Sequence, residues 1–183
     1  MLTPFHWPEM FSLAECSAII RLAEAKGLRE AGLVRGRQNE SIRRAQIAWL
    51  DDAGDAAWVF QRLTGTVLAA NRQHFQFELT EFAERIQVAL YQSDQAGHFD
   101  WHVDIGAGPF ASKRKLTVVA QLSDASSYTG GSLELNATGQ VLTSGRTQGD
   151  AILFPSFIPH RVAEISQGTR FSLTTWVHGP AFR

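Results

Sequence analysis

A change of pattern near residue 75 constrains the fold of this chain more than any other feature. From that point on, short segments of alternating apolar and polar residues are separated by Gly, Asp, Asn, Ser and Pro. Regularly spaced short strands with turn residues between them are typical of a β-sandwich or β-barrel. We expect strands near residues 75–79, 84–92, 98–104, 115–122, 131–136, 140–143, 150–154, 160–165 and 170–178.

The first 74 residues have mainly the spacing of helices. Ser12 and Glu15 form the capping box that marks a helix start, and apolar residues then recur at helical intervals as far as Gly27, a suitable residue to follow a helix end. A second helix is expected after a cap at Asp51 or Asp52, because apolar residues recur at helical spacing from residue 56 to residue 68.

Two short segments between these helices are strand-like, at residues 33–35 and 45–50. No linker rich in Pro, Gly or Ser separates the helical part from the β-rich part. We therefore expect residues 1–183 to form a single domain, in which the helical flank (1–74) packs on one face of the β core (75–183).

Composition narrows the classes of function. The 17 basic and 18 acidic residues give a net charge of −1, whereas a generic nucleic-acid binder needs a basic excess. The single cysteine, Cys16, excludes an internal disulfide framework and a multi-cysteine zinc site. The N-terminus lacks the pattern of a secretory signal, and no apolar run is long enough to span a membrane. We expect a cytoplasmic protein with no nucleic-acid or membrane partner.

The densest polar cluster lies in one of the expected strands. Residues i and i+2 of a strand share a face, so His102 and Asp104 point the same way. In a regular strand His98 and Asp100 share that face too, so a His-x-Asp pair by itself is weak evidence. His160, at the start of a later strand, is the candidate third ligand. Two histidines and one carboxylate are the facial ligand set of non-haem Fe(II) oxygenases.

The last expected strand carries a second candidate site. Arg170, Ser172, Thr174 and Trp176 alternate along it and share one face. An arginine beside small hydroxyl side chains suits a pocket for a carboxylate, because the planar guanidinium binds a carboxylate bidentately and sets its orientation.

With these motifs in this order, the chain resembles the 2-oxoglutarate/Fe(II)-dependent dioxygenases. It is most similar to the prolyl-4-hydroxylase-like branch, which includes the bacterial PKHD-type hydroxylases. The resemblance covers roughly residues 86–178. It is carried by the segments Gly97–Asp104, Lys113–Thr117, Tyr128–Leu133, Gly149–Pro155, His160–Val162 and Gly168–Leu173.

The resemblance implies a mainly β fold with flanking helices, namely a double-stranded β-helix (a cupin-like jelly roll). It implies that His102, Asp104 and His160 bind Fe(II) and that no other side chain is catalytic. It also implies that Arg170 binds the distal carboxylate of 2-oxoglutarate, with Tyr91 and Ser172 as further cosubstrate contacts. Dioxygen is then the second cosubstrate, ascorbate the reductant, and succinate and CO2 the products that accompany hydroxylation.

Two questions stay open at this level. The branch implies an amino-acid-type substrate, a prolyl or other residue, free or within a peptide, and leaves the oligomeric state undetermined. The alternative is a non-redox jelly roll, such as a metal-binding cupin-like or carbohydrate-binding module, because one fold supports many functions. Arg170 discriminates between the two, since a simple metal-binding module has no need of an arginine ten residues past its last ligand.

Overall fold

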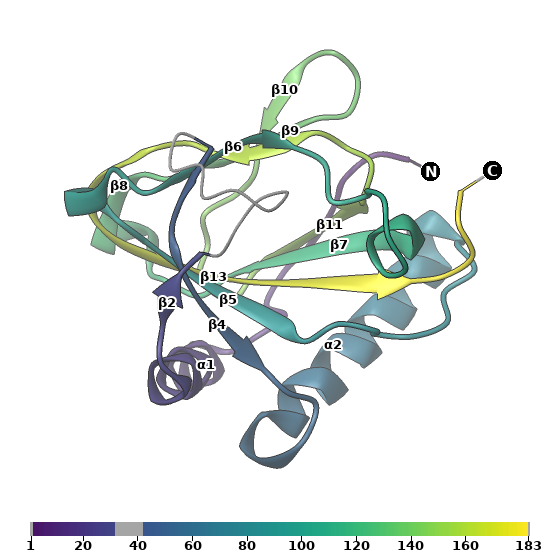
Figure 1. Cartoon of the computed structure of the whole chain (residues 1–183), viewed down its shortest axis with the longest axis horizontal. Coiled ribbons are helices and arrows are strands. Elements are labelled where there is room, and N and C mark those ends of the chain that lie inside the picture. The colour runs from purple at the N-terminus through teal and green to yellow at the C-terminus, as the bar shows by residue number, and fades with distance from the viewer. Residues whose placement is uncertain (1, 32–41, 183) are drawn as a thin grey trace.

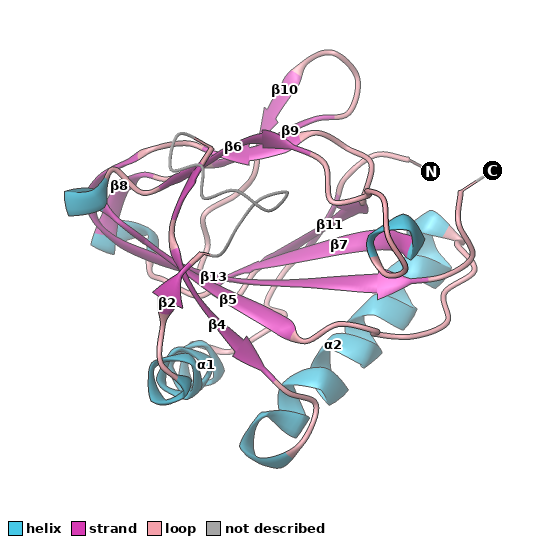
Figure 2. Cartoon of the chain, in the orientation of Figure 1, coloured by secondary structure: helices cyan, strands magenta, loops and turns pink. Residues whose placement is uncertain are grey.

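The structure, a computed structural model, describes residues 2–31 and 42–182 of the chain. Two antiparallel β-sheets face each other, and helices α1 and α2 lie against the outer side of the larger sheet (Figure 1). Figure 2 shows the same separation by element type, with these two helices on one side of the strands. The predicted mainly β fold with flanking helices is confirmed.

The larger sheet has the order β1-β11-β7-β13-β5-β4-β2, and β8 pairs with the first part of β13. Its strands are β1 (Phe5–Trp7), β2 (Arg29–Glu30), β4 (Gln46–Leu50), β5 (Ile86–Gln92), β7 (Arg114–Gln121), β8 (Tyr128–Gly130), β11 (Ala151–Pro155) and β13 (Ile165–His178). The smaller sheet has the order β10-β9-β12-β6-β3. Its strands are β3 (Arg43–Arg44), β6 (His98–His102), β9 (Leu133–Asn136), β10 (Val141–Thr143) and β12 (His160–Val162).

Helix α1 (Leu13–Lys26) begins and ends as the sequence predicts. The Glu15 backbone N–H donates to Ser12 Oγ (3.3 Å) and the Ser12 N–H donates to Glu15 Oε2 (2.8 Å), so both bonds of the capping box form. The helix ends at Gly27, whose φ of +83° is readily adopted only by glycine.

Helix α2 (Ala57–Ala70) begins later than predicted. A 3₁₀ turn, η1 (Gly54–Ala56), precedes it, and no side chain caps its N-terminus. The predicted cap at Asp51 or Asp52 is therefore wrong. The Asp51 carboxylate instead accepts a hydrogen bond from Lys26 Nζ (3.3 Å), and the chain turns through Gly54 (φ +62°) before the helix starts.

The predicted strand at residues 75–79 is also wrong. Helix α2 continues into a π-helical turn, η2 (Asn71–Phe75), which ends at Gln76 in a left-handed conformation (φ +57°). The Asn71 side chain then holds the backbone of Phe77 through two hydrogen bonds of 2.9 Å. Alternating apolar residues here pack beside the helices, as in the stacked pair Phe75–Phe77, and do not pair with a strand.

Most other predicted strands are present, with shifted ends. The segment at 45–50 is β4, and the segment at 33–35 lies outside the described residues. Four strands of two or three residues (β1, β2, β3 and β8) were not predicted, because such short segments carry no periodicity.

Strand β7 shows how the two cores are divided. Leu116, Val118 and Ala120 are buried on the side of the helices, in the core that includes α1 and α2. The alternate residues, Thr117, Val119 and Gln121, face the space between the two sheets. This second face carries polar side chains in an otherwise apolar interior, so the space between the sheets is where a functional site is expected.

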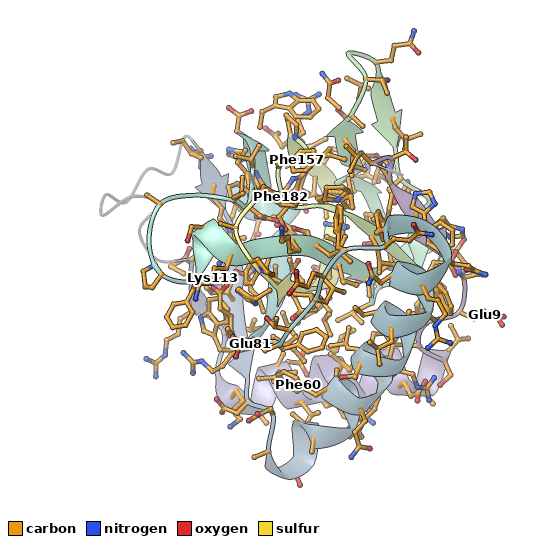
Figure 3. The ribbon with its side chains drawn as sticks, turned by 90° about the vertical axis from the view of Figure 1, so that its right-hand side faces the viewer. Glu9, Phe60, Glu81, Lys113, Phe157 and Phe182 are labelled. Carbon is orange, nitrogen blue, oxygen red and sulfur yellow. The ribbon has the colours of Figure 1, made fainter. Side chains whose placement is uncertain are left out.

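The C-terminal segment covers one edge of the sandwich. Phe182 packs against Phe157 (ring centroids 5.2 Å apart) and Phe77 (5.5 Å), and Figure 3 shows Phe157 and Phe182 close together. Phe60, on α2, lies toward the opposite end of that view.

No helix within residues 2–31 and 42–182 is long and apolar enough to cross a membrane.

Candidate metal centre and cosubstrate site

The structure brings His102, Asp104 and His160 together. His102 ends β6, His160 begins β12, and the two are directly paired across the smaller sheet. Asp104 Oδ1 lies 3.7 Å from His102 Nε2, and Asp104 Oδ2 lies 3.4 Å from His160 Nε2. One potential ligand atom from each residue lies within 4.8 Å of the others, so the three can bind one ion.

A β-bulge sets the direction of His102. Phe99 pairs with Val162 and His102 with His160, so three steps along β6 match two along β12. A regular strand would place His98, Asp100, His102 and Asp104 on one face, but the bulge makes β6 irregular, and only His102 and Asp104 of these four belong to the cluster. The extra residue changes the alternation, and the Phe99 ring stacks on His102 at 3.6 Å.

The rival pair stays apart from this cluster. His98 Nδ1 contacts the carbonyl of Ala96 (2.9 Å), and the Asp100 carboxylate accepts a hydrogen bond from the Trp101 N–H (2.7 Å). Neither side chain belongs to the metal-ligating group found among the described residues.

Backbone carbonyls fix the tautomer of both histidines. His102 Nδ1 lies 2.8 Å from the Asp100 carbonyl, and His160 Nδ1 lies 3.0 Å from the Ile158 carbonyl. A carbonyl only accepts, so each Nδ1 carries the proton and each Nε2 keeps its lone pair for a metal. Burial, together with the nearby His160, lowers the pKa of His102 to about 4, which keeps this imidazole neutral at pH 7.

Asp104 is a buried carboxylate held from the larger sheet. Thr117 Oγ1 donates to Asp104 Oδ2 (2.7 Å) and lies 3.1 Å from Ser156 Oγ. Burial by itself would raise the pKa of Asp104, but His160, His102 and the Thr117 hydrogen bond outweigh it and hold that pKa below its usual value. The side chain is therefore ionised, as a metal ligand must be.

Trp176 and Arg114 form a further layer around Asp104. The Trp176 indole N–H is buried and has no hydrogen-bond partner, yet it lies near enough to help lower the pKa of Asp104. Arg114 Cζ lies 3.9 Å above the Trp176 ring, and Arg114 Nη1 donates to the Asp104 backbone carbonyl (2.9 Å). Arg114 also donates to both oxygens of Glu84, which accepts a third bond from His178 Nε2 (2.9 Å).

Arg170 is completely buried on the same inner face. Its Nε (3.1 Å) and Nη2 (2.6 Å) both donate to Gln121 Oε1, while Nη1 has no partner. Tyr91 is its cross-strand neighbour on β5, with the ring centre 5.5 Å from Arg170 Cζ. Ser172 is buried and lies directly opposite Gln121 on β7.

These residues fit Fe(II) and a dicarboxylate. Two neutral imidazole nitrogens and one carboxylate are the donor set of the facial triad. A buried guanidinium with an unpaired N–H₂ group is costly unless an anion occupies the space beside it. His102, Asp104 and His160 would bind the iron, and Arg170 would bind the far end of the cosubstrate.

Four further residues of the site were not predicted from the sequence, namely Thr117, Gln121, Arg114 and Tyr128, whose hydroxyl oxygen accepts a hydrogen bond from Gln121 Nε2 (2.6 Å). Thr117 and Gln121 did leave a signal, because they are polar and sit four residues apart on one face of an apolar strand. Arg114 and Tyr128 left no such signal, because their places at the site depend on contacts with residues distant in the sequence.

Comparisons with known proteins agree with this geometry. The family model for the 2OG-Fe(II) oxygenase superfamily matches residues 86–178. The chain belongs to this superfamily and is an oxidoreductase that uses Fe(II), 2-oxoglutarate and dioxygen.

Among the relatives is a PKHD-type hydroxylase from Colwellia psychrerythraea, 24% identical over 173 residues, which are 93% of this chain and 75% of the relative. A PKHD-type hydroxylase from Synechococcus elongatus is 29% identical over 115 residues, 61% of this chain and 52% of the relative. YbiX from Shigella boydii, also a PKHD-type hydroxylase, is 26% identical over 155 residues, which are 82% of this chain and 69% of the relative. The matches thus span from about half to three quarters of these relatives' length.

Solved structures show the same fold. A prolyl-4-hydroxylase from Pseudomonas putida has a TM-score of 0.78 at 24% identity and covers 98% of this chain and 94% of its own. A prolyl hydroxylase from Trichoplax adhaerens, in complex with a hypoxia inducible factor peptide fragment, has a TM-score of 0.74 at 19% identity. The match covers 96% of this chain and 83% of that hydroxylase chain. The predicted jelly-roll core with flanking helices is confirmed.

Proposed function

We propose that this protein hydroxylates an amino-acid-type substrate, a prolyl or other residue that is free or within a peptide. 2-Oxoglutarate, dioxygen and the substrate C–H group are converted to succinate, CO2 and the hydroxylated product, with one oxygen atom entering succinate and the other entering the product. In this proposal residues 1–183 act as a single domain in the cytoplasm, with ascorbate as the reductant.

One observation supports this proposal above the others. The His102–Asp104–His160 cluster and the unpaired Nη1 of buried Arg170 both lie in the space between the two sheets. A metal-binding module without redox chemistry requires the metal-ligating cluster but does not require a buried arginine with an unpaired N–H₂ group. The names of the relatives, PKHD-type hydroxylases, point to the same reaction class.

The side chains provide geometry and charge. When bound, iron supplies the dioxygen and redox chemistry that the side chains lack. His102 and His160 present Nε2 because their Nδ1 protons are held by carbonyls, and Asp104 presents a carboxylate fixed by Thr117. Arg170, with Tyr91 and Ser172 beside it, orients the cosubstrate by its distal carboxylate.

Exposed apolar side chains close to the metal ligands support an amino-acid-type substrate. Trp101 and Val103 flank His102 in the sequence and are 37% and 43% exposed. Arg161 Cζ lies 5.1 Å from the Trp101 ring centre. Exposed apolar side chains next to a metal ligand in the sequence can contact an apolar ring or peptide segment of a substrate.

The first test is spectroscopic. Adding Fe(II) and 2-oxoglutarate without oxygen should produce a visible metal-to-ligand charge-transfer band in the wild-type protein. The His102→Ala variant should lose the band, because a nitrogen ligand is removed. A correctly folded, iron-loaded wild-type protein that shows no band would favour the non-redox module.

The second test concerns the substrate. Free amino acids and proline-containing peptides should be screened for 2-oxoglutarate-dependent succinate release, and each active compound checked for the gain of one oxygen atom. Succinate release without a hydroxylated product is uncoupled turnover and would establish only the class. Failure of every amino acid and peptide, with other compounds hydroxylated, would contradict the proposed substrate class.

A further inference from the structure

We propose that Arg43 binds a carboxylate of the substrate, so that the enzyme selects an anionic substrate over its neutral counterpart. The carboxylate belongs either to a free amino acid or to an acidic residue of a peptide, and a guanidinium recognises both in the same way. The inference rests on the proposed function, because it concerns the substrate of the same metal centre.

Arg43 lies on the inner face of the smaller sheet, at its edge. It belongs to the edge strand β3 and is paired directly with Phe99 of β6. Directly paired residues of an antiparallel sheet share a face, and Phe99 packs against the core between the two sheets. Arg43 is therefore on the side of the sheet that holds the metal centre, whereas the next residue, Arg44, alternates to the other face and is exposed.

The Phe99 ring links Arg43 to a metal ligand. Arg43 Cζ lies 4.6 Å from the centre of the Phe99 ring, and that ring stacks on the His102 ring with centroids 3.6 Å apart. A positive charge is thus held one aromatic ring away from His102. A group bound to Arg43 lies beside the metal centre, where a substrate must be held in order to react.

The guanidinium of Arg43 has one edge without a partner. Its Nε and Nη2 atoms are both buried, and neither has a hydrogen-bond partner. These two groups lie on the same edge of the guanidinium and donate in parallel, as the two oxygens of a carboxylate require. Leaving such donors buried and unpaired costs free energy, which a bound anion would recover.

Two other arginines close to the metal ligands show this edge with a partner. Arg114 uses Nε and Nη2 to bind the two carboxylate oxygens of Glu84. Arg161 Nε donates to Glu134 Oε2 (2.8 Å). Within the part of the chain that the structure describes, no acidic side chain pairs with Arg43. We infer that a ligand supplies the carboxylate.

The cosubstrate does not account for this second arginine. Arg170, which would bind the distal carboxylate of 2-oxoglutarate, is completely buried on β13 of the larger sheet. Arg43 is only partly buried and lies on the edge strand of the smaller sheet. A partly buried side chain on an edge strand can turn toward a ligand without disturbing the sheet, so Arg43 is accessible to the substrate.

The test compares pairs of compounds that differ only in a carboxylate. Free amino acids are paired with their amides, and short peptides containing Asp or Glu with the same peptides containing Asn or Gln. Binding is measured by calorimetry on the anaerobic protein loaded with Fe(II) and 2-oxoglutarate, for wild type, Arg43→Met, Arg43→Lys and, as the matched control, Arg44→Met. Methionine keeps an apolar stem against Phe99 and removes the charge, and circular dichroism with thermal melting checks the fold.

We expect wild type to bind the carboxylate member of at least one pair about 10- to 100-fold more tightly than its amide, the usual effect of hydrogen bonds to a charged group. Arg43→Met should bind both members equally, and Arg43→Lys should keep only part of the preference, because an ammonium lacks the planar fork. Arg44→Met should discriminate like wild type. A preference among the amino acids identifies a free substrate, and one among the peptides identifies an acidic peptide.

Two results would overturn the inference while leaving the proposed function intact. In one, wild type binds no carboxylate compound more tightly than its amide. In the other, Arg43→Met keeps the preference, or loses affinity for 2-oxoglutarate as well, which is the signature of a structural role at the metal centre. Absence of the charge-transfer band in wild type would overturn the proposed function and this inference together.

Discussion

Arg114 contacts one candidate metal ligand and two residues that lie beside it. It binds Glu84 through two N–H groups, the Asp104 carbonyl through a third, and the face of Trp176 through its charge. Side chains of this kind do not contact the metal, but they fix the position of a ligand that does. Lysine can replace only part of these contacts, because an ammonium lacks the planar fork of donors.

We predict that Arg114→Ala weakens metal binding about 10- to 100-fold, the range typical of residues that orient metal ligands. Arg114→Lys should restore only part of this loss. Titration with Co(II), followed in the visible spectrum, measures both the affinity and the coordination geometry. If Arg114→Ala lowers thermal stability but leaves the Co(II) affinity and spectrum unchanged, Arg114 only supports the fold.

Glu84 makes the stability of this region depend on pH. Burial raises its pKa, but the hydrogen bonds from Arg114 and His178 outweigh this effect and lower the pKa from 4.5 to about 2. A pKa lowered in the folded state stabilises the protein above the unfolded value, and this contribution is lost as pH falls from 4.5 toward 2.

We therefore expect wild type to be more stable than Glu84→Gln near neutral pH, with the difference shrinking below pH 4.5. Urea unfolding of both proteins across this range measures the effect. A constant difference in the free energy of unfolding from neutral pH down to about pH 3 would show that ionisation of Glu84 is not its source.

At the scale of single elements, the start of α1 is specified locally. The capping box of Ser12 and Glu15 lies on the surface, away from the metal centre. Ser12→Ala should lower the free energy of unfolding by about 1 kcal/mol, the usual effect of losing such a cap. Chemical denaturation measures this, and metal affinity should not change. A change in metal affinity would indicate coupling between α1 and the site.

Elements with local signals were predicted well, and elements that depend on distant partners were not. The capping box and Gly27 define α1 within the sequence, whereas the segment 75–79 has strand-like alternation but no strand to pair with. The bulge in β6 exists only through its register with β12, so the sequence of residues 98–102 could not reveal it.

The candidate site shows the same division. His102, Asp104, His160 and Arg170 could be chosen from spacing and residue type, because metal and carboxylate chemistry restricts the side chains that serve. Tyr128 could not be chosen this way, since its place beside Arg170 follows from the pairing of β8 with β13 and from the Gln121 contact.

At the scale of the whole molecule, the metal centre joins the two sheets. His102 and His160 belong to the smaller sheet, while Asp104 is held by Thr117 of β7 in the larger one. A metal bound by all three residues therefore stabilises the sandwich only when both sheets are in place. The unfolded chain cannot offer this geometry.

We predict that Mn(II) or Co(II) at about 100 times its dissociation constant raises the free energy of unfolding by about 2.7 kcal/mol. Denaturant unfolding at constant temperature measures this, and calorimetry should show a higher Tm. Asp104→Ala should lose most of the stabilisation, because the link between the sheets is removed. Equal stabilisation of wild type and Asp104→Ala would place the metal elsewhere.

The position of Trp176 gives the protein a fluorescent reporter of its own. This indole is buried near the Asp104 carboxylate, and the guanidinium of Arg114 lies over its ring. A paramagnetic ion at the ligands should quench its emission, whereas the diamagnetic ion Zn(II) should change the emission far less. Comparison with Trp176→Phe would assign the signal, so that occupancy of the centre can be followed in time without any added dye.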